Sequence, residues 1–414
     1  MQPLPGFRDF LPADCAGRNY IFSRWRDVAR RYGFMEWDGP VLESTDLYRK
    51  KSGNEIVDQL FHFVDKGKRE VALRPELTPS LARVVAAHER EFKKPLKWFS
   101  IGQFFRYEKQ QRGRLREHYQ LNCDIIGETS LAGDVELIAL AIDQLRGFGL
   151  RETDFVVRLS DRQFWTEFLL SERVPEMQWQ DVLAVIDKSE REPKEKTKER
   201  LGRLAEPVLN ILNEGGKSER LDSIMHGLRA RGLADYVTVD VRIVRGLAYY
   251  TGSVFEIFDR AGRFRALAGG GRYDNLVSQL IDGASSLPAA GFAMGDVVLG
   301  ELIADTAHAR AQMERTIEMQ HQIDVFAVIA KEERREHALK YVHALRDAGF
   351  RVDYALAPAK VPKQFQTAEQ LHATYAVVFG DEWPEVAVKD LTTGQQTSIP
   401  VDALLERLKS QPGR

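Results

Sequence analysis

Hydrophobic and polar residues alternate along the chain with two different periods. A spacing of three to four residues predicts helices over 14–33, 78–92 and 134–149, with Asp14 and Thr78 as the expected N-caps. Shorter runs of continuous or alternating apolar residues predict strands between the helices. These runs are 34–44, 59–65, 70–75, 96–108, 117–128, 155–161, 238–246, 249–259, 264–272 and the start of 288–307.

Three of these runs carry a local expectation. Pro40 lies inside the run 34–44 and cannot donate to a strand ladder, so this strand is expected at a sheet edge or with a bulge. The runs 59–65 and 70–75 are expected to pair as a hairpin. The glycines of GGGRYD, residues 269–274, lack the G-x-G-x-x-G spacing of a dinucleotide site, and we interpret them as a tight turn or bulge.

The pattern changes twice along the chain. From about 160 to 236 it is helical and polar, and the charged run at 188–200 indicates a solvated helix face or linker, with a nucleic-acid contact as the alternative. Strands and helices alternate again near the C-terminus, which is typical of a compact α/β unit with a mostly parallel sheet. The predicted fold class is therefore α/β with an α+β core. We expect a core at 1–308 that contains the helical insertion, a linker at 309–322 and a second domain at 323–414.

Composition narrows the class of protein. The 414 residues are 43% hydrophobic and 29% charged, which excludes an intrinsically disordered chain. A net charge of −2 argues against a general polyanion binder but not against local basic patches. The two cysteines cannot form a disulfide framework and fit a reducing compartment. We find neither a secretory signal nor an apolar run near ~18 residues, so no membrane span and a cytoplasmic location are expected.

Arginines supply the first candidate chemistry. Arg106 interrupts an apolar strand where a loop begins, and the planar guanidinium suits an enclosed phosphate or carboxylate. The loop that follows carries Arg112, Arg114 and Arg116 around Gly113, an arrangement able to close over a polyphosphate. The alternative for any one of these arginines is a solvated surface charge.

Other polar residues occur in the same elements. Glu76, Glu108 and Asp124 are candidates to hold Mg²⁺ or a substrate ammonium group, with local ion pairing as the alternative. His118 is a strand-end polar residue or a partner for base stacking, and Cys123 is interpreted as buried and inert. No H-E-x-x-H, paired CxxC or G-x-S-x-G occurs, so no protein-bound metal site and no acyl nucleophile are predicted.

The strand–loop–strand segment FRYEKQQRGRLREHYQ, residues 105–120, resembles motif 2 of class II aminoacyl-tRNA synthetases. Four further segments resemble sequence motifs of the histidyl-tRNA synthetase family: LPGFRDFLP at 4–12, LRPELTPSLAR at 73–83, VRGLAYYTGSVFE at 244–256 and GGGRYDNLV at 269–277. The final segment is similar to the family's anticodon-binding domain. The resemblance implies a class II antiparallel sheet flanked by helices and covers nearly the whole chain.

What the resemblance implies is an ATP-dependent ligase. Histidine and ATP, with Mg²⁺, give histidyl-adenylate, and the histidyl group then passes to tRNA(His). The first helix and the segment around Pro40 resemble motif 1, which forms the dimer interface in class II synthetases, so a homodimer is expected. At the start of a helix in the last domain, Lys363 and Gln364 are candidate anticodon contacts.

The resemblance also assigns roles to residues. Arg106 and Arg245 are the expected catalytic residues, near the α-phosphate. The histidine site is expected to comprise Glu76, Leu77, Thr78, Arg106, Gln120, Asp124, Arg245, Tyr249 and Tyr250. The ATP site is expected to comprise Arg106, Glu108, Arg114, Arg116 and His118.

The sequence departs from the family's pattern at two points. Ala248 stands where the family usually has an aspartate. Motif 3 normally carries a glutamate and an arginine that flank ATP, and this chain has Val297 and Val298 there. A paralogue that regulates ATP phosphoribosyltransferase by sensing histidine, without charging tRNA, is therefore the alternative. The retained arginines and the last domain favour the synthetase.

Overall fold

The computed structural model forms two compact units, Met1–Met313 and Glu314–Arg414, which we describe separately. It describes residues 2–52, 58–108, 111, 113–216, 218–244, 250–280 and 287–410. Among these residues no helix combines the length and apolarity that crossing a membrane requires.

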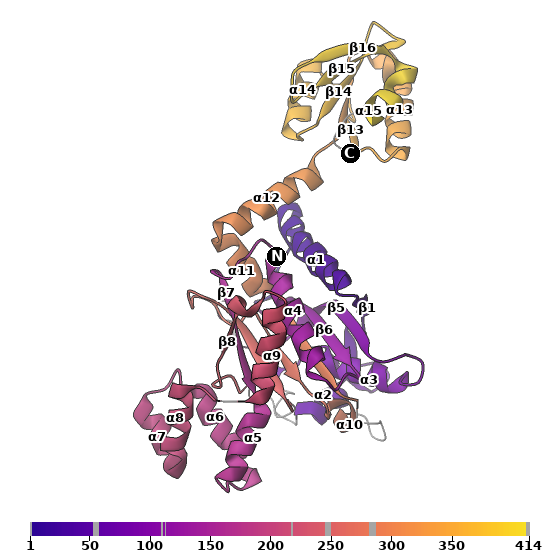
Figure 1. Cartoon of the computed structure of the whole chain (residues 1–414). Helices are drawn as coiled ribbons and strands as arrows, with labels where there is room; N and C mark the ends of the chain where they lie inside the picture. The colour runs from indigo at the N-terminus through magenta and orange to yellow at the C-terminus, as the bar shows by residue number, and fades with distance from the viewer. Residues whose placement is uncertain are drawn as a thin grey trace. The chain divides into compact units, whose positions relative to one another are not determined.

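The first unit is built around an eight-stranded sheet of order β1-β5-β6-β11-β10-β9-β7-β8 (Figure 1). All neighbouring strands are antiparallel except the outer pairs β1–β5 and β7–β8. The predicted antiparallel class II sheet is confirmed. In this order the strands are Met35–Glu36, Leu96–Phe105, Glu117–Ile126, Ala289–Gly295, Ala268–Arg272, Ser253–Asp259, Phe155–Asp161 and Val237–Val239.

Helices cover one face of this sheet. α4 (Leu131–Arg146) packs on β6, β10 and β11, α9 (Glu219–Ala230) packs on α4 and β7, and α1 (Pro12–Arg31) packs on α4 and on α11 (Asp296–Asp305). Cys123 on β6 is fully buried, and burial raises the pKa of its thiol well above the usual range, which confirms an inert cysteine. Because α4 covers one face of β6, β10 and β11, a ligand site on these central strands would lie on the opposite face.

The first helix begins two residues before its predicted start at residue 14. The helix begins at Pro12, whose fixed φ suits the first helical turn. Asp14 is the third helical residue, and its Oδ2 accepts the backbone N–H of Leu11 at 3.2 Å. In α3 (Thr78–Ala87) the N-cap is Leu77, and Thr78 is the first helical residue.

Two strand predictions are also corrected. The run around Pro40 divides into β1 and β2 (Leu42–Ser44), and β2 joins β3 (His62–Val64) and β4 (Glu70–Leu73) in a separate three-stranded sheet. Both β1 and β2 are edge strands, so the expected edge position is confirmed. The predicted hairpin β3–β4 is confirmed. The glycines of GGGRYD form neither a turn nor a bulge, because they lie extended in the buried strand β10. α2 (Thr45–Ser52) and α10 (Leu276–Leu280) pack on α3 and on each other.

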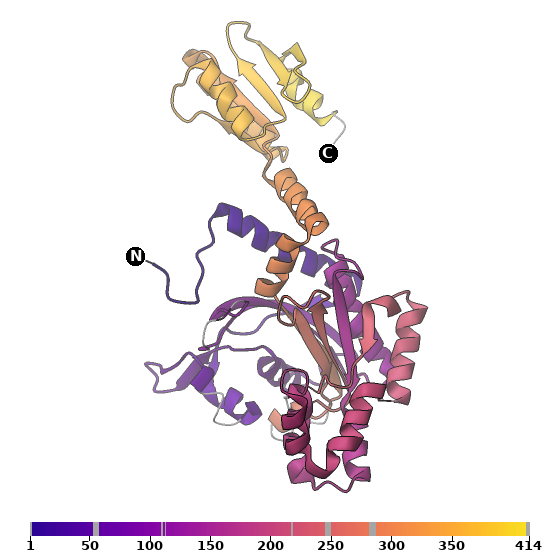
Figure 2. The same ribbon diagram turned by 90° about the vertical axis from the view of Figure 1, so that its left-hand side faces the viewer.

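The expected helical insertion has its own core. Figures 1 and 2 show its first four helices gathered as a cluster beside the large sheet, and Trp165, Leu169, Ile186 and Val208 are fully buried there. α9 instead packs on α4 and on β7 of the large sheet. The four helices are α5 (Arg162–Ser171), α6 (Trp179–Lys188), α7 (Lys194–Leu201) and α8 (Ala205–Glu214).

The second unit holds a five-stranded sheet of order β13-β12-β14-β15-β16. Only β13–β12 and β12–β14 are parallel, so the predicted mostly parallel sheet is in fact mixed. The polar stretch expected as a linker is α-helical, in α12 (Ala307–His321). The elements that follow are β12 (Val325–Ile329), α13 (Arg335–Asp347), β13 (Val352–Tyr354), α14 (Val361–Gln370), β14 (Tyr375–Phe379), β15 (Glu385–Asp390), β16 (Gln396–Pro400) and α15 (Leu404–Lys409).

Gln364 is placed where it cannot read an anticodon. Its side chain is 1% exposed. Its Oε1 accepts the backbone N–H of Ile329 at 2.9 Å, and its Nε2 donates to the carbonyls of Ile329 and Ala359 at 2.8 Å. The residue therefore joins α14 to β12, and the interpretation of Gln364 as a base contact is wrong.

Candidate active site

The open face of the central strands forms a cavity of about 660 Å³. On β6 the side chains of His118, Gln120, Asn122 and Asp124 share this face, because residues two apart in a strand point the same way. The neighbouring strands β10 and β11 have glycine or alanine at the paired positions, which leaves room above the sheet. These small residues are Gly269, Gly271, Gly291, Ala293 and Gly295.

Glycine is required where three polar or aromatic side chains converge. A Cβ on Gly291 would overlap Asp124 Oδ1 and lie 2.8 Å from the Tyr273 hydroxyl, and one on Gly271 would lie 2.9 Å from the ring of Tyr250. The Tyr273 hydroxyl donates to Asp124 Oδ1. Asp124, Tyr250 and Tyr273 are all at most 6% exposed. Two of the three, Asp124 and Tyr250, are residues expected in the histidine site.

Arg106 lies at the end of β5, beside the segment that precedes α3. Its Nε donates to the carbonyl of Pro75 at 3.0 Å, and the N–H of Phe105 donates to the carbonyl of Arg74 at 3.0 Å. Arg74 is itself buried and pairs with Asp38 Oδ1 at 2.6 Å, so it is a structural residue. The backbone before α3 is thereby fixed next to Arg106.

The three expected histidine contacts of this segment differ in exposure. Glu76 and Thr78 are half-buried, whereas the side chain of Leu77 is 1% exposed and packed in the core. None of them lines the large cavity. Thr78 lines a small apolar hollow together with Tyr273, which connects this segment to the Asp124 side of the site.

Described residues of the loop after Arg106 line the cavity. Arg114 forms an ion pair with Glu108, and both line the cavity. Gly113 has a φ of +72°, a conformation that favours glycine, and a Cβ there would lie 3.1 Å from the side chain of Val298. The loop thus meets the start of α11, where Val297 and Val298 form part of the cavity wall.

Arg116 is not among the residues that line the cavity. Its Nε donates to the carbonyl of Glu108 at 3.3 Å, and its guanidinium lies 4.2 Å from the ring centroid of Tyr107. In this structure Arg116 therefore supports the loop. Arg245 and Tyr249, which the resemblance also placed in the site, lie outside the described residues.

The charge of the cavity favours an anionic ligand. Among the residues that the structure describes, four arginines line it, against two glutamates. Three further residues that were not predicted from the sequence also line the cavity: Arg191, in the loop between α6 and α7, Glu256, on β9, and Arg265, after β9. The period-two pattern of β9 was a signal for Glu256, but no local pattern distinguishes Arg191 or Arg265 from surface arginines. In the described ranges no cluster of three or more His, Cys, Asp or Glu side chains is able to hold a metal ion.

His118 lines the cavity as a neutral ring. Burial, and next the charge of Arg106, lowers its pKa from the ordinary 6.5 to about 4. Between about pH 6.5 and 4 the unfolded chain therefore binds a proton that the folded chain does not. The free energy of unfolding should fall as the pH drops through this window, by at most about 1.4 kcal/mol per pH unit.

We expect His118→Phe to remove this contribution. Urea unfolding of the wild-type chain and of the variant at pH 7 and pH 5 measures it, and the variant should lose less stability on acidification. If both proteins lose the same amount, His118 is not the group that titrates.

The comparisons with known proteins decide the family. A family model described as histidyl-tRNA synthetase matches residues 6–297. The chain belongs to the histidyl-tRNA synthetase family. A second model, described as an anticodon binding domain, matches residues 322–411. The family resemblance noted in the sequence is confirmed.

Relatives agree with this assignment over nearly the whole chain. "Histidine--tRNA ligase" of Opitutus terrae is 44% identical, covering 96% of this chain and 96% of the relative. "Histidine--tRNA ligase, chloroplastic/mitochondrial" of Arabidopsis thaliana is 38% identical over 98% of this chain and 86% of the relative. A crystal structure of histidyl-tRNA synthetase from a Nostoc species has the same fold, with a TM-score of 0.78, 24% identity and coverage of 99% and 98%.

Proposed function

We propose that this chain is a histidine–tRNA ligase that activates L-histidine with ATP and transfers it to tRNA(His). The observation that carries the proposal is the juxtaposition of a buried carboxylate–tyrosine cluster with an arginine-lined cavity on one sheet face. The relatives that share nearly its whole length carry the same activity in their names.

The cluster around Asp124 suits the imidazole of histidine. Tyr273 donates to Asp124 Oδ1 and thereby orients a carboxylate, the kind of acceptor that an imidazole N–H requires. Tyr250 packs over Gly271 and closes the pocket against water. Glu76 and Thr78 are the candidates for the ammonium group. A site that bonds a polar ring in this way rejects amino acids without such a ring.

The first step is an in-line displacement. A carboxylate oxygen of histidine attacks the α-phosphorus of ATP, the bond from this phosphorus to the bridging oxygen breaks, and pyrophosphate leaves. Arg106 holds the histidine carboxylate and the α-phosphate together and neutralises charge as it develops, and the family resemblance assigns Arg245 to the α-phosphate as well. The 3′-terminal ribose hydroxyl of the tRNA then attacks the histidyl carbonyl, and AMP leaves.

Magnesium fits this cavity as a companion of ATP. Mg²⁺ prefers one or two carboxylates together with substrate phosphates, and Glu108 and Glu256 are the carboxylates of the cavity. Bound there, Mg²⁺ would neutralise phosphate charge. Glu108 also positions Arg114 through their ion pair, and neutral His118 offers a flat ring to the adenine.

The second unit supports tRNA as the other substrate. Its family model is an anticodon-binding domain, which a histidine sensor without tRNA would not need. We propose residues 1–308 as the catalytic part, with the helical insertion, residues 309–322 as the linker and residues 323–414 as the anticodon reader. Nothing observed favours the regulatory alternative, and tRNA charging accords with a cytoplasmic location.

Pyrophosphate exchange tests the first step. We expect the purified chain to exchange labelled pyrophosphate into ATP when L-histidine is present and not when it is omitted or replaced by another amino acid. Exchange at the level of a blank without enzyme would refute the proposed activity. Histidine binding without exchange would instead support the regulatory alternative.

We also propose that the chain forms a two-fold homodimer. Apolar side chains near Pro40, those of Met35, Val41 and Leu42, are 41–60% exposed in the single chain, and an interface there would cover them. Light scattering at micromolar concentration should give twice the mass of one chain. The mass of a single chain would contradict the proposal.

A further inference from the structure

One wall of the ATP cavity lacks the charges that the family usually places there. Val297 and Val298, at the start of α11, occupy the positions of the motif 3 glutamate and arginine, and both line the cavity. An apolar wall provides no compensation for the negative charge of a triphosphate. The positive charge that motif 3 usually supplies to the phosphates would therefore have to come from another element of this chain.

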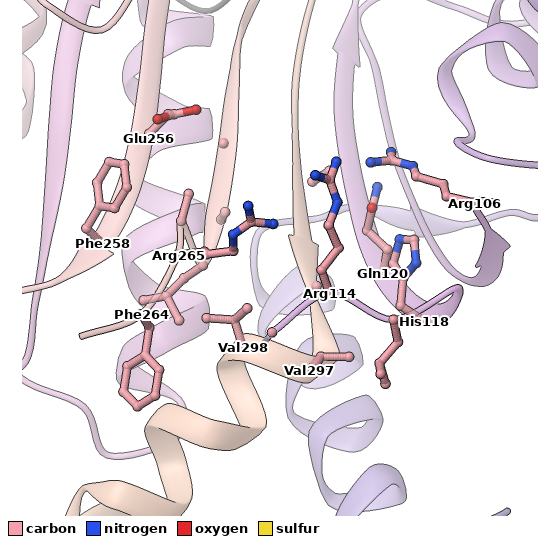
Figure 3. Close-up of a pocket in the computed structure, with 18 of the residues that line it drawn as sticks. Arg106, Arg114, His118, Gln120, Glu256, Phe258, Phe264, Arg265, Val297 and Val298 are labelled. Carbon is pink, nitrogen blue, oxygen red and sulfur yellow. The ribbon is translucent and has the colours of Figure 1, made fainter. Parts of the chain in front are cut away.

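Arg265 is placed to supply that cation. It lies in the loop before β10 and lines the cavity. Figure 3 shows its guanidinium directed into the same space as those of Arg106 and Arg114, above the side chain of Val298. Arg106 and Arg114 belong to the strand–loop–strand segment 105–120, whereas Arg265 comes from the connection between β9 and β10, and all three line the same cavity.

The partners of these arginines differ. Arg114 is paired with the carboxylate of Glu108, and Arg106 uses its Nε on a backbone carbonyl. Arg265 Nη2 donates to the neutral amide oxygen of Gln111 at 3.0 Å, and within the described ranges no carboxylate lies at ion-pair distance from it. Its charge is therefore still available for an anionic ligand, and Gln111 holds it near the motif 2 loop.

The loop that carries Arg265 is fixed in advance of binding. The carboxylate of Asp259, 2% exposed, accepts the backbone N–H groups of Arg263 and Phe264 at 3.0 Å. Leu267 N–H donates to the carbonyl of Ile257 at 2.8 Å. Bonds on both sides of Arg265 restrict the loop, so little conformational entropy is lost when a ligand binds.

We propose that Arg265 binds the β- and γ-phosphates of ATP and takes the part of the absent motif 3 arginine. The inference rests on the proposed function for the identity of the ligand. Of the three arginines that converge in Figure 3, Arg106 serves the α-phosphate, which leaves Arg114 and Arg265 for the outer phosphates, alongside Mg²⁺. A charge-assisted contact between a guanidinium and a phosphate is expected to change affinity by about 10- to 100-fold.

Titration calorimetry with Arg265→Ala tests the inference with two ligands. The first is ATP. The second is a sulfamoyl analogue of histidyl-adenylate, which keeps the adenosine and histidyl parts and has no outer phosphates. We expect the Kd for ATP to rise at least about tenfold and the Kd for the analogue to stay within about twofold. Arg265→Lys should give an intermediate Kd for ATP, because it keeps the charge and loses the planar fork.

The matched control is Arg260→Ala. Arg260 lies in the same connection between β9 and β10, and it donates to the carbonyls of Glu152 and Asp235 outside the cavity. This variant should bind both ligands as the wild type does. An unchanged Kd for ATP in Arg265→Ala would overturn the inference, and so would equal weakening of both ligands, which would place Arg265 on the adenosine. A wild-type chain that binds ATP but shows no histidine-dependent exchange would instead refute the proposed function alone.

Discussion

Arg106→Ala should lower the rate of histidine-dependent pyrophosphate exchange about 1,000-fold. Arg106 lines the cavity between the backbone before α3 and the polar face of β6, where the proposed histidine and ATP sites would meet. Its Nε is held by the carbonyl of Pro75, which aims the two terminal nitrogens into the cavity. Both nitrogens are then available to the histidine carboxylate and the α-phosphate.

The size of the effect follows from where the charge develops. As the carboxylate attacks, negative charge grows on the α-phosphate oxygens, and losing one preorganised donor at such a position costs about 10²–10³ in rate. Arg106 supplies a full charge and more than one donor, so the upper end of this range applies. The loss should appear mainly in kcat, because the contact is strongest in the transition state.

The measurement compares kcat and KM for both substrates in the wild type, Arg106→Ala and Arg106→Lys. The lysine variant should recover only part of the rate, because an ammonium group cannot bond two oxygens in one plane. Circular dichroism should be unchanged, since the side chain lies at the surface of the cavity. A kcat within tenfold of the wild type would reject the assigned role.

Much of the site was predictable because the alternation of residues along a strand determines which face of the sheet each side chain occupies. His118, Gln120 and Asp124 alternate along one strand, and alternation places them on one face whatever the rest of the fold does. The same rule would have added Asn122, which accepts a hydrogen bond from Gln120 Nε2 at 2.9 Å. The alternation does not identify a ligand, and the roles of these residues in binding histidine and ATP came from the family resemblance.

The remaining features depend on contacts between distant segments. The glycines of β10 indicate a turn locally, but they are extended because β10 pairs with β9 and β11 on both sides. Gly270 is a glycine because the Phe292 side chain and the backbone of Gly291 leave no space for a Cβ. Arg74 and Arg265 are both arginines beside strands. Arg74 is buried against Asp38, whereas Arg265 faces the cavity. The sequence around each residue does not distinguish these two environments, because they arise from contacts with distant segments.

Asp124→Asn should raise the KM for histidine about 100-fold and leave the KM for ATP unchanged. The substitution keeps the shape of the side chain and replaces one acceptor oxygen with an NH₂ group. Because Tyr273 donates to Oδ1, the amide either loses that bond or turns its NH₂ toward the imidazole N–H. A buried donor that faces another donor costs roughly 1–3 kcal/mol, which is about 10- to 100-fold in affinity.

Two companion variants separate recognition from packing. Tyr273→Phe removes the hydroxyl that orients Asp124 but keeps the carboxylate, so the KM for histidine should rise less, by about tenfold. Cys123→Ser changes the neighbouring residue on the opposite face of β6 and should alter stability without a change in the KM for histidine. Equal KM values for histidine in Asp124→Asn and the wild type would show that another group reads the imidazole. Since Asp124 lies among Gly291, Tyr250 and Tyr273, that group would then have to come from outside this buried cluster.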